Sequence, residues 1–441
     1  MKDLLDNIFG IFAGPFFVLF GGVVIYFTLS LLGYDIKPIL SFAIALSPIW
    51  LPVALFYLTF EKWMEYVHKK FSISTGRTTL RLHLPQEVFK SPEAMESVIA
   101  QIHNVNSPDN LWQTYIDGKR PLGYSFELVS YGGDVRFYVN VPTKKTRNAV
   151  EAQLYAQYPG IEIVEEAVDY TAEITADLDK YEMMAFHMGK KEDEVFPIKT
   201  WIDFGLDKMP KEEEKFDPIS TMLEQLSTAA PHERIWVQIL ALPHAKKNFK
   251  SGSLTTQSTW EGKVKKKIDE MLMRDVGRAT DDDETAAMPR LTTGERDVIT
   301  AMERNAGKYA YETAIRWMYI TKPGKFNGDF IGPMIRSFSI YDIIGRNGIG
   351  VRWRTDFDYN WFSDFSGRRK KQLKKEELMA YKKREYDHRD KKGGADKRKI
   401  FSSEELATMF HVPGQTVATP GLARVPSAKR EAPPNLPIKQ S

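Results

Sequence analysis

The stretch "GYSFELVSYGGDVRFYVNVP", residues 123–142, contains the pattern from which the fold is predicted. Apolar and polar residues alternate on both sides of Gly132-Gly133, as they do in two half-buried strands that are joined by a tight turn. The stretch therefore predicts an antiparallel hairpin whose turn lies at the two glycines.

The segments around this hairpin complete a larger unit. Residues 78–85 alternate as a strand does, and residues 92–102 carry apolar side chains at helical spacing after a Ser-Pro start. A second helix is expected from about 144 to 158, and residues 161–166 read as a fourth strand. The order βαββαβ predicts a ferredoxin-like module over residues 72–170, in which two helices cover one face of the sheet.

A second module with the same order is expected over residues 195–357. Its predicted elements are strands at 196–204, 234–243, 311–321 and 348–357, a helix after Asp217-Pro218 and another at 328–342. Residues 244–310 interrupt this module. Long structureless loops are uncommon in compact domains, so a helical arm is expected there.

The first 70 residues predict a transmembrane hairpin. Residues 7–34 and 38–60 are free of charged side chains, and each run exceeds the roughly 20 residues that a membrane-spanning helix needs. A signal peptide and a buried helical hairpin are the alternatives. Basic residues cluster after the second run at Lys62, Lys69, Lys70, Arg77 and Arg81. This cluster predicts a multi-pass protein of the bacterial inner (cytoplasmic) membrane with both termini in the cytoplasm. The expected fold class is thus an α+β membrane protein.

The segment 358–400 is strongly basic. Residues 367–400 hold 15 Lys or Arg against 6 Asp or Glu, whereas the whole chain has a net charge of only +3. Three interpretations stay open: a solvated helix or linker, contacts with nucleic-acid phosphates, and contacts with anionic lipid. The candidate nucleic-acid or lipid contacts are Arg368, Arg369, Lys370, Lys371, Lys374, Lys375, Lys382, Lys383 and Arg384.

The motifs that common enzymes require are absent from the sequence. The chain has no cysteine, no G-x-x-x-x-G-K-[ST] loop for nucleotide phosphates, no H-E-x-x-H zinc motif and no G-x-S-x-G nucleophile elbow. The sequence therefore predicts a protein that is not an enzyme, with no catalytic or metal-binding residue and no cofactor.

The segment 401–441 combines a short helix with a proline-rich, extended tail. Ser402 and Glu405 form a capping box, and Pro413 ends the helix. Such a short helix is marginal alone, so its apolar face is expected to dock on the chain's own second module or on a partner. The candidate docking residues are Phe401, Glu405, Leu406, Met409, Phe410, His411 and Pro413.

The strand "RIWVQILALP" at 234–243, the segment "FSSEELATMFHVPG" at 401–414 and the later "VATPGLARVPSAKREAPPNLP" resemble a region of known proteins. They are similar to the part before the motor in bacterial conjugative type IV secretion ATPases, coupling-protein relatives of the FtsK/HerA class. The resemblance implies a membrane-anchored, non-catalytic subunit that docks a separate hexameric ATPase for the translocation of DNA or protein and is itself a homo-oligomer. No ATPase residue can be carried over. The alternative is a stand-alone membrane-anchored protein that binds nucleic acid through its basic segment.

Overall fold

The computed structural model describes residues 41, 44–86, 90–142, 146–175, 177, 179–207, 216–245, 259–272, 291–355, 367–385, 398–414, 417 and 419–425. By its internal contacts the chain divides into two compact units, residues 1–67 and 68–441. The sheet and every site discussed below lie in the second unit.

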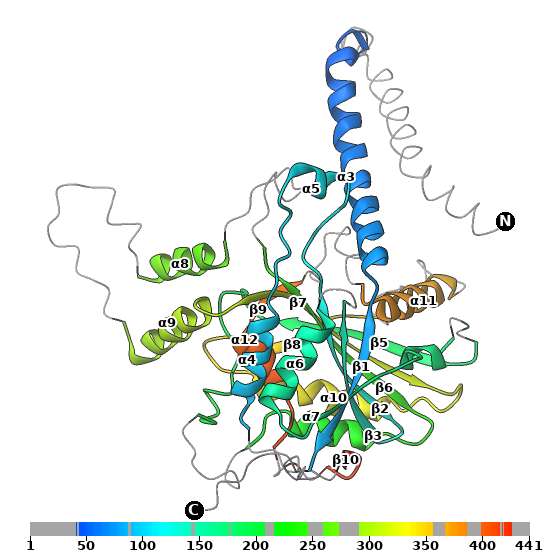
Figure 1. Cartoon of the computed structure of the whole chain (residues 1–441), viewed down its shortest axis with the longest axis vertical. Helices are drawn as coiled ribbons and strands as arrows, with labels where there is room; N and C mark the ends of the chain where they lie inside the picture. The colour runs from blue at the N-terminus through cyan, green and yellow to red at the C-terminus, as the bar shows by residue number, and fades with distance from the viewer. Residues whose placement is uncertain are drawn as a thin grey trace, which may run out of the picture. The chain divides into compact units, whose positions relative to one another are not determined.

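Nine strands of the described part form one antiparallel sheet (Figure 1). They are β1 (Thr78–Pro85), β2 (Tyr124–Tyr131), β3 (Asp134–Val141), β4 (Glu162–Glu165), β5 (Glu182–Lys190), β6 (Arg234–Pro243), β7 (Ala310–Thr321), β8 (Ile349–Arg354) and β9 (Lys399–Ser402). The order along the sheet is β4-β1-β3-β2-β6-β7-β5-β8, and β9 pairs with the start of β7. A short β10 (Arg424–Val425) adds in parallel to the end of β1.

This sheet corrects the predicted fold class of two ferredoxin-like modules behind a membrane hairpin. The strands of both halves belong to one continuous sheet, because β2 of the first half pairs along its whole length with β6 of the second, from Tyr124 opposite Ala241 to Tyr131 opposite Arg234. Within the sheet the two halves have matching strand orders, β4-β1-β3-β2 and β8-β5-β7-β6. The edge strands of the two expected modules thus become central strands.

The first strand of the second half is also corrected. Residues 196–204, which the sequence predicts as a strand, form turns, and the strand is β5 at 182–190. The backbone amides of Ile198 and Trp201 donate to the side chains of Glu405 and Thr408 and not to a neighbouring strand. β5, "EMMAFHMGK", lacks β-branched residues, so its local strand propensity is weak and its place is set by burial on both faces.

One face of the sheet is covered by five helices (Figure 1). These are α4 (Pro92–Ile102), α6 (Arg147–Gln157), α7 (Ser220–Ser227), α10 (Ile331–Ser337) and α12 (Ser403–Met409). Their apolar side chains and the alternate residues of the strands, such as Leu128, Val237 and Trp317, form the largest core cluster. Strand periodicity explains this arrangement, since every second side chain points to the same face.

The opposite face of the sheet is covered by α11 (Arg368–Lys383). Leu378 and Tyr381 of this helix pack on Val129, Trp236 and Met318, which alternate with the residues of the first face. The sheet is therefore buried on both faces, whereas helices on a single face were expected.

The insertion between β6 and β7 contains α8 (Trp260–Met271) and α9 (Thr293–Ala306). Both helices are amphipathic, and they join Val195 and Ile400 in a third, smaller apolar cluster. Two further helices, α3 (Ser47–Thr75) and α5 (Leu111–Tyr115), precede β1 and β2.

No helix in the described part of the chain combines the length and the apolar run that crossing a bilayer requires. The apolar part of α3 extends only from Ser47 to residue 60, about 21 Å of helix against a hydrocarbon core of about 30 Å. This finding corrects the predicted transmembrane hairpin and the multi-pass location in the bacterial inner membrane. The first predicted span, at 7–34, lies outside the described residues.

The helix α12 begins with the predicted capping box, in which Ser402 Oγ accepts from Glu405 N at 3.2 Å and Glu405 Oε2 accepts from Ser402 N at 2.8 Å. Its apolar side is buried in the main core, where the ring of Phe410 lies 5.1 Å from Phe126 and 5.6 Å from Phe137 between centroids. The helix therefore packs within its own domain.

Replacement of Phe410 by Ala is expected to lower the free energy of unfolding by about 3–5 kcal/mol, because it leaves a cavity between two aromatic rings. Urea denaturation followed by circular dichroism measures the loss. Ile344→Ala, at a fully exposed position, is the control and should change stability by less than about 0.5 kcal/mol. A Phe410→Ala protein as stable as this control would contradict the packing described.

Candidate anion-binding site

The helix α11 is rich in strong helix formers and lies between two residues with positive φ, Gly367 at its start and Arg384 at its end. Left-handed backbone is common for glycine after a helix but unfavourable for arginine. Arg384 keeps this conformation because its side chain is held on the sheet.

A row of polar side chains crosses the face of the sheet that α11 covers. Cross-strand partners place Tyr138, Glu127, Gln238, Arg316 and His187 side by side on β3, β2, β6, β7 and β5. We call these five residues the polar row. Four of its members bond to the helix or to the residues after it, through Arg384, the carbonyls of Ala380, Tyr381 and Glu385, and the carboxylate of Glu377.

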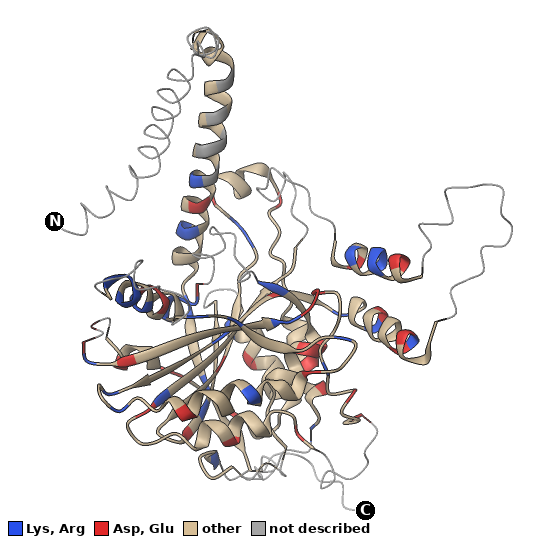
Figure 2. Ribbon diagram, turned by 180° about the vertical axis from the view of Figure 1, so that it is seen from behind, with Lys and Arg blue, Asp and Glu red and all other residues tan. Residues whose placement is uncertain are grey.

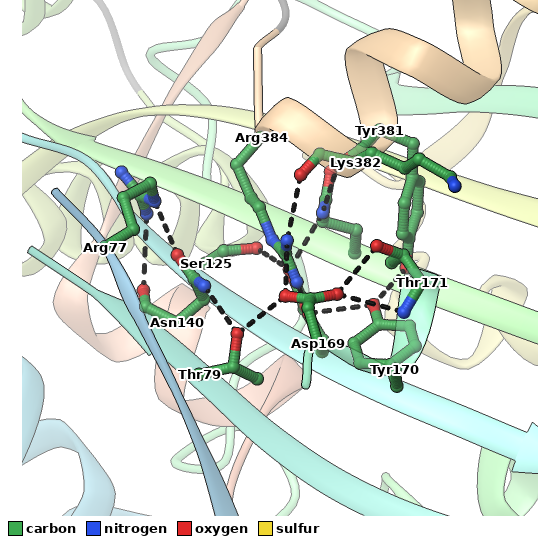
Figure 3. Close-up of polar contacts among 12 residues, drawn as sticks. Arg77, Thr79, Ser125, Asn140, Asp169, Tyr170, Thr171, Tyr381, Lys382 and Arg384 are labelled. Carbon is green, nitrogen blue, oxygen red and sulfur yellow. Dashed lines mark hydrogen bonds and ion pairs between the residues drawn. The ribbon is translucent and has the colours of Figure 1, made fainter. Parts of the chain in front are cut away.

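Glu127 and Arg384 form the central ion pair of this row. Figure 3 shows Arg384 beside Asp169 and Tyr170. Arg384 Nε and Nη2 donate to the two carboxylate oxygens of Glu127 at 3.0 and 3.1 Å, and Nη1 lies 2.7 Å from Asp169 Oδ2. Tyr170 and Gln238 donate to the same Glu127 carboxylate at 2.8 Å each. A fully buried carboxylate is tolerable here because every lone pair that faces the protein is used.

The pKa values of the charged groups around Glu127 reflect this pairing. Burial alone would lower the pKa of Arg384, but the nearby Glu127 and Asp169 raise it well above its usual value. Burial raises the pKa of Asp169, and Arg384 together with hydrogen bonds from Thr171 and Thr79 outweighs this, so that the net pKa is lowered. Both groups are therefore charged near neutral pH.

The opposite side of α11 is basic and faces solvent (Figure 2). Of the predicted contacts, five are exposed and three are half-buried. The exposed residues are Arg368, Arg369, Lys371, Lys375 and Lys383; the half-buried residues are Lys370, Lys374 and Lys382. The ninth, Arg384, does not share this surface, since its side chain is only 5% exposed and points to Glu127. We call the eight other residues the basic face of α11.

A cavity of about 460 Å³ opens beside the C-terminal end of α11. Its wall combines the last residues of α3, the start of β1, the loop before β2, the end of β6 and the residues after α11. Six lining residues are basic and two are acidic: Lys69, Arg77, Arg120, Lys383, Arg384 and Arg398, with Glu312 and Glu385. We call this space the basic cavity.

The predicted docking residues occupy the chain's own core. Phe401, Glu405, Leu406, Met409, Phe410, His411 and Pro413 are all buried. Glu405 forms a fully buried ion pair with Lys190 at 2.8 Å, and His411 Nε2 lies 2.8 Å from Asp217 Oδ1. Burial is the largest influence on the pKa of Lys190 and lowers it. These side chains thus offer no exposed surface to a separate ATPase.

Sequence reasoning named Lys383 and Arg384 as candidate contacts but missed Glu127, Asp169 and the cavity in which the two basic residues meet Arg77 and Arg120. Glu127 and Asp169 look like solvent-facing carboxylates in their own segments, and the sequence interpretation places Arg77 in a cluster at a membrane surface. Arg120 follows Lys119 in a short loop. A usable signal is the period of β2, in which Ser125 and Glu127 alternate with apolar residues and so share one face.

A comparison with protein families matches residues 67–325 to the family described as "Domain of unknown function (DUF8128)". The match covers more than half of the 441 residues. The chain belongs to the DUF8128 family. Comparisons with curated proteins and with solved structures gave no match. The DUF8128 match includes Arg77, Arg120, Glu127 and Asp169, whereas α11 and Arg384 follow it in the chain.

Replacement of Glu127 by Gln is expected to lower the free energy of unfolding by about 3–5 kcal/mol, because Arg384 then keeps a buried charge without its main carboxylate partner. Chemical denaturation measures the change. Glu376→Gln on the solvent side of the same helix removes an equal charge and should cost less than about 1 kcal/mol. Equal stabilities of the two variants would refute the central role of the ion pair.

Stability should also fall in acid. The pKa of Asp169 is lowered in the folded chain, so its contribution is present above the unfolded value of 3.8 and is lost as the pH falls through the folded value. We expect Asp169→Asn to be less stable than the wild type at pH 7 by about 2 kcal/mol, and the difference to shrink toward pH 2. Unfolding free energies at several pH values measure this. A difference that is independent of pH would contradict it.

Proposed function

We propose that this chain is a non-catalytic protein that binds nucleic acid through contacts between the basic face of α11 and the phosphate backbone. The observation that supports the proposal best is the division of α11 into two sides. One side is packed on the sheet through Leu378 and Tyr381, and five Lys and Arg residues are exposed on the other side.

The charge of α11 is unfavourable for the helix itself. Its sequence contains eight basic and two acidic residues, and its first turn has no acidic residue to favour the helix dipole. Like charges at i,i+3 and i,i+4 and cations near a helix N-terminus each destabilise a helix by a few tenths of a kcal/mol. A purely structural helix gains nothing from this arrangement, whereas a phosphate-binding helix requires it.

Arg368, Lys375 and Lys383 of this face form no ion pair with a carboxylate in the described part of the chain. Glu377 is buried against His187 at 2.5 Å, and Glu376 accepts from Gln372 at 3.0 Å. Lys371 forms an ion pair with Asp179, both of them largely exposed. The exposed aromatic surface of α11 is negligible, since Tyr381 is buried. Phosphate contacts without base stacking predict binding with little sequence preference.

Replacement of Arg368, Lys371 and Lys375 by Gln tests the proposal. Binding of the purified full-length chain to a fluorescent single-stranded oligonucleotide should weaken by at least tenfold at low salt. The slope of log K against log salt should become shallower by about 2, because each phosphate contact contributes about 0.7. Fluorescence anisotropy at several salt concentrations measures both quantities.

A matched control carries the same charge change elsewhere. Lys265, Lys266 and Lys325 are exposed and lie outside α11, and their replacement by Gln should leave the slope unchanged. Equal effects of the two triple variants would show that only the net charge matters and would overturn the proposal. Binding to vesicles of anionic lipid without binding to any oligonucleotide would overturn it as well.

A further inference from the structure

The basic cavity differs from the basic face of α11 in shape and in lining. It is a hollow of about 460 Å³, within the roughly 300–1,000 Å³ that is typical of small-molecule sites, whereas the face of α11 is an open helix surface. Most of its lining residues come from outside α11. The basic cavity is therefore a site for a small ligand that differs from the basic face of α11.

Two of its basic side chains are neutralised by carboxylates. Arg384 is held by Glu127 and Asp169, as described above, and Arg398 Nη1 lies 3.8 Å from Glu312 Oε2. These pairs form part of the wall and leave little charge for a ligand.

Two others have no such partner. The side chains of Arg120 and Lys383 make no hydrogen bond or ion pair with the residues that the structure describes. Glu385 attracts Arg120 at longer range from the rim of the cavity. Both cations are thus available to a ligand without loss of an internal contact.

Arg77 is the third available charge (Figure 3). Its Nη2 donates to the carbonyl of Gly123 at 2.9 Å and its Nε donates to the side-chain oxygen of Asn140. Both acceptors are neutral, so they orient the guanidinium without cancelling its charge. Burial and the neighbouring Arg384 lower the pKa of Arg77 to about 10, and burial lowers that of Arg120.

The remaining wall of the cavity is largely apolar. Leu122 comes from the loop before β2, Tyr124 is the first residue of β2, and Leu240 and Leu242 come from the end of β6. Inorganic phosphate would use the cations alone, whereas a ligand with a compact, flat organic group would also bury this apolar surface.

We propose that the basic cavity binds a small phosphate monoester of nucleotide size, with Arg77, Arg120 and Lys383 on the phosphate and the leucines on the organic group. Guanidinium groups suit this role, because their planar fork donates two parallel hydrogen bonds to phosphate oxygens. The site shares only Lys383 with the basic face of α11 and requires no bound nucleic acid, so it goes beyond the function proposed above.

Isothermal titration calorimetry of the full-length chain with adenosine 5′-monophosphate, adenosine and inorganic phosphate tests the proposal. The monophosphate should bind at least tenfold more tightly than either of the other two. Arg120→Gln should weaken its binding by about tenfold, since a charge-assisted hydrogen bond is lost. Because the Arg120 side chain has no partner within the described chain, the thermal transition of this variant should match the wild type.

Two further variants separate this site from the basic face of α11. Lys383→Gln should weaken binding of the monophosphate, whereas the triple variant at Arg368, Lys371 and Lys375 should leave it unchanged. The proposal is wrong if the monophosphate does not bind the wild type, or if Arg120→Gln and Lys383→Gln both bind it with unchanged affinity. Inorganic phosphate binding as tightly as the monophosphate would refute the role of the apolar wall.

Discussion

The ion pair between Glu127 and Arg384 is the interaction on which the second face of the sheet depends. Glu127 lies at the joint between the two halves, directly opposite Gln238, and the polar row extends from there across the neighbouring strands. Buried charges are unfavourable unless each is paired. The row can therefore be buried only when α11 is in place, with Arg384 at its end and Glu377 on His187. The second face of the sheet is therefore buried by α11, as the first face is by the five other helices.

Local patterns predict much of the sheet and little of its assembly. The hairpin of β2 and β3, the helix α4 and the strand β6 follow from periodicity that lies within each segment. The pairing of β2 with β6 has no local signal, because an edge strand and a central strand can have the same alternation. The sequence also has no local signal that α11 packs on the second face. Residues such as Glu127 and Arg316 are polar, as a solvent-facing row would be, and their burial becomes evident only with α11.

The two candidate sites differ in how far the sequence predicts them. The basic face of α11 follows from a run of charges that no other part of the chain repeats. The basic cavity does not, since Arg77 and Arg120 lie more than forty residues apart in the sequence and meet through the pairing of β1, β3 and β2. The docking role was expected for α12 because the helix is short. A short helix needs a surface to pack on, but its length does not show whether that surface belongs to the same chain or to a partner.

The position of the last segments in the core constrains how the chain acquires its structure. β10 pairs with β1 across more than three hundred residues, with Leu84 opposite Arg424, and Val135 N donates to the carbonyl of Gly421 at 2.8 Å. During synthesis, the groove that receives α12 stays unfilled until Ser403–Met409 has been made, more than three hundred residues after β1. Contacts of such long sequence separation form slowly, and the apolar groove is exposed in the meantime. An apolar groove that is exposed for this long makes the nascent chain prone to aggregation.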